Sequence, residues 1–232
     1  MLRPIGSPFP LGALTLVPAG ILLPGLQLGW FDPADANTIP FLILGFAVPL
    51  QLLACTLGFL GRDSLVGTGF GIFAGVWLAF GLTGAIDGVA KTSDVLGVFF
   101  LSCGALFAML MARGLAGGKT AAGAVILAGS ARFIVSGLYE LTGNGGLEHA
   151  AGIVGLVFAA VAAYTGLAAL LEDGAHRPIL PLGRRRRARA AVEHGMTAHL
   201  GELHQEAGVR EQLQTGHEPI LPDRLPPLLV GQ

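Results

Sequence analysis

Residues 65–86 read LVGTGFGIFAGVWLAFGLTGAI and contain no charged side chain. A helix of ~20 apolar residues is long enough to cross the ~30 Å hydrocarbon core of a bilayer. Outward from this stretch, five more stretches of similar or slightly shorter length have the same apolar character. The sequence therefore predicts an all-α, polytopic membrane protein with six transmembrane helices, over 11–30, 38–60, 65–86, 95–112, 121–141 and 150–172.

Outside these stretches, the basic residues fall almost entirely on one side of the predicted helices. When the loops are sorted by side, Lys91 is the one Lys or Arg on its side. Cytoplasmic loops carry the excess of Lys and Arg. The asymmetry therefore predicts that both termini are cytoplasmic, in a multi-pass protein of the plasma membrane. The acidic residues that share the side of Lys91 are Asp32, Asp35, Asp87, Asp94 and Glu148.

Composition agrees with a membrane-embedded chain. Charged residues make up 12% of it and hydrophobic residues 53%. The mean hydropathy is +0.68. We expect a cytoplasmic N-terminus over 1–10, a transmembrane domain over 11–173 and a basic, largely disordered cytoplasmic tail over 174–232. The two cysteines have no histidines near them and give no metal-ligand spacing, so we expect neither a metal nor a cofactor.

A run of four arginines, Arg184–Arg187, follows the last predicted helix. A basic cluster beside the cytoplasmic face attracts anionic lipid headgroups, at ~1 kcal/mol per charge. The same run would also serve simply as a topology anchor, and the sequence leaves both interpretations open. Because a position beside the membrane already accounts for these charges, we expect no nucleic-acid partner.

Glycine is frequent, with 36 residues in the chain. Gly67, Gly71 and Gly75 recur every four residues and form a flat face on the third predicted helix. Such a face lets another helix approach closely. The pattern indicates ordinary helix packing, a contact between subunits, or a helix beside a narrow path.

Two of the apolar stretches contain prolines, which make them candidates for a site inside the membrane. Pro18 and Pro24 interrupt the first stretch, and Pro49 lies within the second. A proline leaves carbonyls without helical partners, and in a bilayer such groups persist only inside protein or beside a wet cavity. Gln51, two residues after Pro49, is a candidate hydrogen-bonding group for a small polar solute. Alternatively, it bonds to a neighbouring helix.

Several short motifs occur in the order found in one family. Ser7-Pro8-Phe9-Pro10-Leu11-Gly12 resembles the Asn-Pro-Ala-Pro-Leu-Gly signature of the acetate uptake transporter family. Ser7 replaces the signature asparagine, and Phe9 replaces a small residue. The resemblance extends over about residues 5–183. The further segments that carry it are Pro49–Ala54, Phe73–Trp77, Gly143–Asn144, His149–Gly152 and Leu180–Gly183.

The resemblance implies a path for small monocarboxylates in each subunit of a hexamer. It implies transport of acetate above all, with succinate as a second substrate and protons as the coupling ion. The family's apolar constriction of Phe, Tyr and Leu falls here on Leu16, on Phe73 and near Gly129. These departures predict a wider constriction. Gln51 and Trp77 lie in resembling segments and are expected to line the same path.

Arg132 is the anomaly of the fifth predicted helix, because it lies close to the centre. An arginine there costs at least ~2.5–3.5 kcal/mol unless it faces protein or water. One hypothesis is that Arg132 faces the pathway and holds a carboxylate by a two-pronged hydrogen bond. The alternative is that it bonds carbonyls, or an acid across a subunit contact.

His149, at the start of the sixth predicted helix, is a candidate pH gate because histidine titrates near neutral pH. A helix-start histidine without a role is the alternative interpretation.

Two other functions fit the sequence. A channel for small neutral solutes such as ammonia or amides would suit Gln51 and a wide apolar path. A non-transporting membrane protein, such as a sensor, would use the basic tail to recruit a partner. We expect no enzyme, because the predicted helices carry no nucleophile–base pair, phosphate-binding glycine loop or convergent carboxylates.

Overall fold

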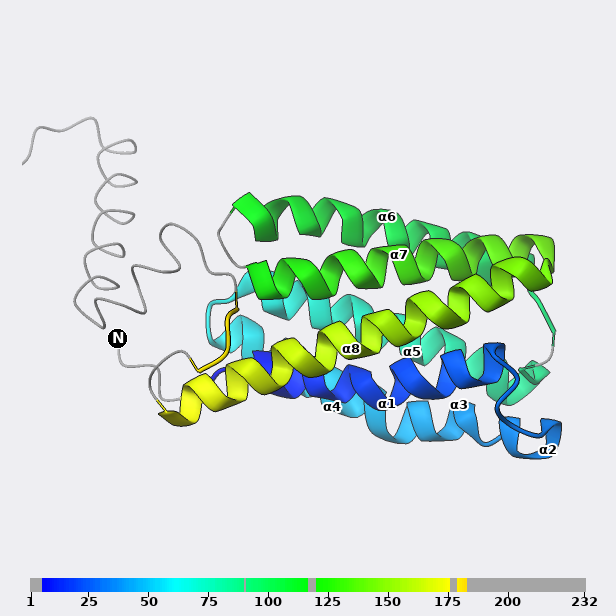
Figure 1. Ribbon diagram of the computed structural model, residues 1–232, viewed down its shortest axis with the longest axis horizontal. Coiled ribbons are helices and arrows are strands. Elements are labelled where there is room, and N and C mark those ends of the chain that lie inside the picture. Colours follow the sequence, from blue (N-terminus) through cyan, green and yellow to red (C-terminus); the bar gives the residue numbers. More distant parts are fainter. Residues whose placement is uncertain (1–5, 90, 117–119, 176–178, 183–232) are drawn as a thin grey trace, which may run out of the picture. The chain divides into compact units, whose positions relative to one another are not determined.

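The structure of the protein is a computed structural model that describes residues 6–89, 91–116, 120–175 and 179–182. Within these residues the regular secondary structure is entirely helical (Figure 1). The elements are α1 (Phe9–Gln27), α2 (Pro33–Ala36), α3 (Ile39–Leu42), the π-helix η1 (Ile43–Ala47), α4 (Val48–Leu60), α5 (Ser64–Asp87), α6 (Asp94–Ala116), α7 (Thr120–Thr142) and α8 (Gly145–Ala175).

Six helical segments of the described chain are long and apolar enough to cross a membrane. The predicted all-α fold with six transmembrane helices is confirmed, while the side on which the termini lie stays a prediction. The sixth segment begins earlier than expected because Asn144 Oδ1 accepts hydrogen bonds from Gly146 N (2.8 Å) and Leu147 N (3.2 Å). The segments are Phe9–Gln27, Ala34–Leu60, Ser64–Asp87, Asp94–Ala112, Thr120–Thr142 and Gly145–Ala175.

The long helices pack in three close pairs, α1 with α8, α4 with α5 and α6 with α7, and α7 also packs against α8 (Figure 1). Glycine makes the α4–α5 contact close, since a Cβ at Gly58 would lie 2.7 Å from the backbone nitrogen of Gly67. Gly67 and Gly71 both face side chains of α4, whereas Gly75 faces open space. The predicted glycine face is therefore used for packing within the chain over two of its three positions.

The prolines of the first two spans have different surroundings. Pro18 and Pro24 lie inside the continuous helix α1, in keeping with the single span predicted over this stretch. A single helix accommodates both because other groups can satisfy the few carbonyls that lose a partner. In the second span, η1 ends directly before α4, whose second residue is Pro49. The wider π-turn suits a position where the chain lacks an amide hydrogen.

The chain returns to the bundle after α8. Thr120 Oγ1 donates to the carbonyl of Leu182 at 2.6 Å, and the hydroxyl of Tyr164 donates to the carbonyl of Pro181 at 3.0 Å. The predicted domain boundaries stay predictions. The expected disorder of the tail and the lipid contact of Arg184–Arg187 lie outside the described residues.

Candidate functional site

Gln51, in the first turn of α4, connects this helix to the first turns of α1. Its side chain is completely buried. Nε2 donates to the carbonyl of Gly12 and to Thr15 Oγ1, both at 2.7 Å. Oε1 is also buried and has no donor among the described residues. Gln51 is therefore bonded to a neighbouring helix through one end of its amide, and the other end is an open acceptor.

Four phenylalanines form a layer across the interior, which we call the aromatic layer: Phe73 of α5, Phe107 of α6, Phe133 of α7 and Phe158 of α8. Each is at most 1% exposed. The Phe73 ring centre lies 4.3 Å from that of Phe107, 5.5 Å from that of Phe158 and 6.0 Å from that of Phe133. Such ring pairs contribute ~0.5–1.5 kcal/mol each beyond the burial of their area. The layer is apolar and contributed by four helices.

Of the positions expected to form a constriction, Phe73 belongs to this layer and Gly129 lies beside it. Leu16 and Phe73 are both buried. A Cβ at Gly129 would lie 2.8 Å from Phe73 Cζ and 3.5 Å from Phe158 Cε2. The Phe73 ring therefore fills the Cβ space of Gly129, and the Phe158 ring lies at ordinary contact distance. The wider constriction stays a prediction.

Arg132 lies on α7 one turn beyond Gly129 and is only 1% exposed. Its Nη1 donates to the carbonyl of Ala151 on α8. In the described part of the chain Nη2 has no acceptor, and no carboxylate forms an ion pair with the guanidinium. The side chain lies against Gly155, where a Cβ would be 3.0 Å from Nε. Arg132 therefore bonds a carbonyl of its own chain, as one hypothesis expected, and both N–H groups of Nη2 lack an acceptor among the described residues.

The contacts that Gln51, Phe158 and Arg132 make along α1 show the order of these residues along the bundle. The Gln51 amide binds the first turns of this helix. The Phe158 ring lies 3.5 Å from the Cβ position of Gly20, near the middle of the helix. Arg132 lies beside Pro24, since both contact the same glycine of α8. At ~1.5 Å per residue, the two polar levels are separated by roughly 14–18 Å, and the Phe158 ring lies between them.

Trp77 and Gln27 add two more buried polar atoms without partners among the described residues. These atoms are Trp77 Nε1 and Gln27 Oε1. Trp77 is 1% exposed and meets Phe133 edge to face at 6.0 Å. Buried polar atoms without partners are rare in folded proteins. They join Gln51 Oε1 and Arg132 Nη2 as buried polar atoms without partners among the described residues.

The acidic residues near the end of α7 already have partners. The hydroxyl of Tyr139 donates to Glu148 Oε1 at 3.1 Å, and Glu140 Oε2 accepts from the backbone nitrogen of Ser93 at 2.9 Å. These contacts join α7 to the starts of α8 and α6. His149 is exposed beside them, and its gating role stays a prediction.

The signature residues build the beginning of α1. Pro10 lies in its first turn, where a missing N–H removes no helical hydrogen bond. Gly12 contacts the Phe70 ring, which a Cβ at this position would strike. Its carbonyl accepts the hydrogen bond from Gln51. The signature residues that are exposed or half-buried are Ser7, Pro8, Phe9 and Leu11.

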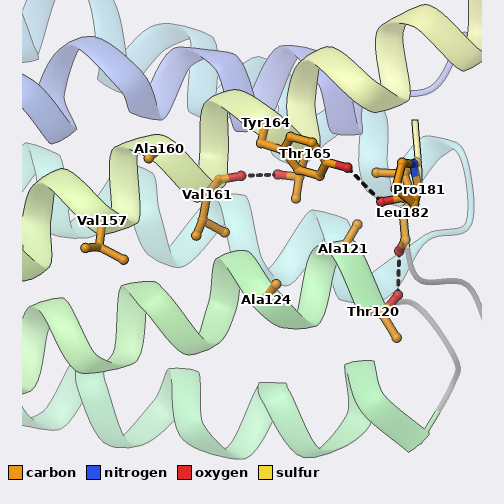
Figure 2. Close-up of a pocket in the computed structure, with 10 residues that line it drawn as sticks. All are labelled: Thr120, Ala121, Ala124, Val157, Ala160, Val161, Tyr164, Thr165, Pro181 and Leu182. Carbon is orange, nitrogen blue, oxygen red and sulfur yellow. Dashed lines mark hydrogen bonds between the residues drawn. The ribbon is translucent and has the colours of Figure 1, made fainter. Parts of the chain in front are cut away.

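A separate groove of about 540 Å³ lies between α7 and α8. Figure 2 shows three of its hydroxyl groups bonded to backbone carbonyls. The rest of the lining is apolar, so the groove contains none of the unpartnered polar atoms described above. Its residues are Thr120, Ala121, Ala124, Val157, Ala160, Val161, Tyr164, Thr165, Pro181 and Leu182.

Sequence reasoning did not single out Thr15, Phe158 or Gly155. Thr15 carried a detectable signal, because it is a hydroxyl residue within an apolar stretch, three residues after the signature. Phe158 and Gly155 are an apolar residue and a glycine in a helix rich in both, and nothing in the pattern distinguishes them from their neighbours.

Comparison with known proteins extends the description of the fold. No family model and no curated protein matches the chain. A solved structure of the bacterial acetate channel SatP matches it with a TM-score of 0.68 and 23% sequence identity. The match covers 77% of this chain and 99% of that one. The resemblance noticed in the motifs is therefore confirmed at the level of the fold, which this multi-pass membrane protein shares with an acetate channel.

Proposed function

We propose that the protein provides a transmembrane path for small monocarboxylates in the plasma membrane, as a member of the acetate uptake transporter family. The observation that carries the proposal is Arg132, a buried guanidinium whose Nη2 has no acceptor within the described residues. The fold shared with an acetate channel supports this function. It also supports a transporting role over an enzymatic one.

The chemistry of a carboxylate matches the groups in the interior. A buried cation without a counter-charge is unfavourable, and a carboxylate that accepts from the Nη2 of Arg132 would neutralise it through a charge-assisted hydrogen bond. At the other level, Gln51 Oε1 is an acceptor. It suits the hydroxyl of a protonated acid, whereas an anion would be repelled there. A small acid would thus pass as the neutral form at one level and as the anion at the other.

This difference between the two levels favours coupling to protons, which the family resemblance also implies. By the same resemblance we propose a hexamer, which native mass spectrometry of the purified protein would test. Succinate, with a second carboxylate, is the weaker substrate candidate, since a single guanidinium faces the interior beside Pro24.

The test is uptake of radiolabelled acetate into proteoliposomes, with and without an inward proton gradient. Arg132→Gln should lower uptake by tenfold or more, corresponding to at least ~1.4 kcal/mol of lost interaction. Arg62→Gln, which removes an exposed charge between α4 and α5, should leave uptake unchanged. Normal uptake by a folded Arg132→Gln protein would refute the anion site. Uptake that ignores the gradient would indicate a channel without coupling.

A neutral-solute channel is the second candidate, because Gln51 Oε1 and Trp77 Nε1 offer an acceptor and a donor that need no charge on the solute. Under this function Arg132→Gln would leave the flux of ammonia or formamide unchanged, and acetate would not enter the vesicles. Light scattering by proteoliposomes after a solute jump measures both.

A further inference from the structure

We propose that the groove between α7 and α8 binds one acyl chain of an anionic phospholipid, whose headgroup is held by the arginine run Arg184–Arg187. The groove is separate from the polar groups of the interior, so the proposal does not depend on the proposed transport function. It concerns the surface of the bundle at the end where α7 begins and where the chain returns after α8.

The groove has the size and the opening that a hydrocarbon chain requires. Its volume of about 540 Å³ lies within the range of sites for small ligands. Val157, Ala160 and Tyr164 of α8 line it and are exposed. The first and last of these are separated by roughly 10 Å along the helix axis. Figure 2 shows Val157 toward one end of the groove and Leu182 at the other.

The lining is suited to hydrocarbon and not to a polar solute. All three hydroxyl groups that line the groove, those of Thr120, Tyr164 and Thr165, donate to backbone carbonyls. The other lining residues are alanines, valines, a proline and a leucine. A carboxylate would therefore lose its hydration here without gaining a donor from the side chains of the lining. An acyl chain needs no such partner and binds by van der Waals contact.

The chain continues from the groove directly into its most basic segment. Leu182 lines the groove, and Arg184–Arg187 begin two residues later. The hydrogen bond from Thr120 to the Leu182 carbonyl holds this point of the chain at the start of α7. Since one residue spans at most ~3.6 Å, connectivity alone keeps the first arginine within roughly 7 Å of Leu182. A basic cluster beside a membrane attracts anionic headgroups, so the groove and the arginines match the two ends of one lipid molecule.

The same charges favour a lipid over a second copy of the chain in the groove. Subunits of a cyclic membrane oligomer share one orientation, so a neighbouring copy would bring its own arginine run to the same level. Like charges at such a contact repel each other. An anionic headgroup compensates them instead.

Native mass spectrometry of the full-length protein tests the groove, with phosphatidylglycerol and phosphatidylcholine of identical acyl chains as probes. Ala160→Trp fills the groove from α8 and should lower the apparent affinity for phosphatidylglycerol by roughly tenfold. Ile153→Trp is the matched control, because Ile153 is also exposed on α8 but does not line the groove. It should leave the affinity unchanged.

The headgroup contact is tested by two double variants that remove equal charge. Arg184→Gln with Arg185→Gln should lower the affinity for phosphatidylglycerol by roughly tenfold or more, to the level of phosphatidylcholine. Arg210→Gln with Arg224→Gln removes two charges farther along the sequence and should keep the preference for phosphatidylglycerol.

Val157→Trp fills the groove nearer its other end and covers the case in which Ala160→Trp does not fold. Unchanged phosphatidylglycerol binding by these variants in folded form would overturn the proposal. Equal binding of the two lipids by the unaltered protein would overturn it as well. If Ala160→Trp changes the mass of the protein assembly and loses no lipid, the groove belongs to a contact with a second copy and the proposal is wrong.

Discussion

Gln51 connects two helices through a single nitrogen, which donates to Gly12 and Thr15 at the same distance of 2.7 Å. Gln51→Leu keeps the size of the side chain but removes both bonds and the open acceptor. We expect the free energy of unfolding in detergent to fall by about 1 kcal/mol, typical of a polar contact between membrane helices. Acetate uptake should fall by roughly tenfold if the acceptor contacts the substrate.

The control for Gln51→Leu is Thr56→Val on the same helix. Thr56 is exposed and its hydroxyl bonds only the carbonyl of Leu52, within α4. The Thr56→Val substitution should leave both the free energy of unfolding and acetate uptake nearly unchanged. A Gln51→Leu protein that is destabilised but transports normally would make Gln51 a packing residue without a role in the path.

Helix packing gives the next prediction, at the contact between α4 and α5. A Cβ at Gly58 would lie 2.7 Å and 2.8 Å from backbone atoms of Gly67, which cannot move aside as a side chain would. Gly58→Ala should therefore force the helices apart and lower the free energy of unfolding by about 1–3 kcal/mol. Gly75→Ala on α5 meets nothing within 4 Å and should be neutral or slightly stabilising. Thermal unfolding in detergent compares the two.

The opposite order of stability would contradict the packing described for α4 and α5. A third result is informative as well: if Gly75→Ala keeps the fold but changes the mass of the native particle, then Gly75 belongs to a contact between copies of the chain.

Elements were predictable from the sequence where one physical property dominates. Hydropathy alone decides that residues 65–86 form a membrane helix, and α5 covers Ser64–Asp87. Hydropathy does not report the hydrogen bonds that define a helix end, so the predicted start of α8 was several residues too late. Hydropathy also does not distinguish a π-turn from an α-turn, so η1 before Pro49 was not predicted.

For the molecule as a whole, the sequence identified the polar groups of the candidate site better than their surroundings. Gln51 and Arg132 were predictable because a polar side chain in an apolar stretch must find a partner or a function. The register of α8 against α7 and α1 was not, since it depends on how side chains and glycines fit together. That register sets Phe158 opposite Gly129. The same register places the carbonyl of Ala151 beside Arg132. Residue types alone cannot predict this contact, because every residue has a backbone carbonyl.

Sidedness is the prediction that belongs to the whole molecule, and α5 allows it to be tested with one matched pair. Arg62 and Lys91 are both exposed and lie in the connections before and after this helix. The helix has 24 residues, or roughly 36 Å, so the two positions lie on opposite faces of the membrane. In a chain with Cys55→Ala and Cys103→Ala, we expect Lys91→Cys to react with an impermeant maleimide in intact cells. Arg62→Cys should react only after the cells are opened. The reverse pattern would place both termini outside and contradict the charge rule, because the Lys- and Arg-rich side would then be the external one.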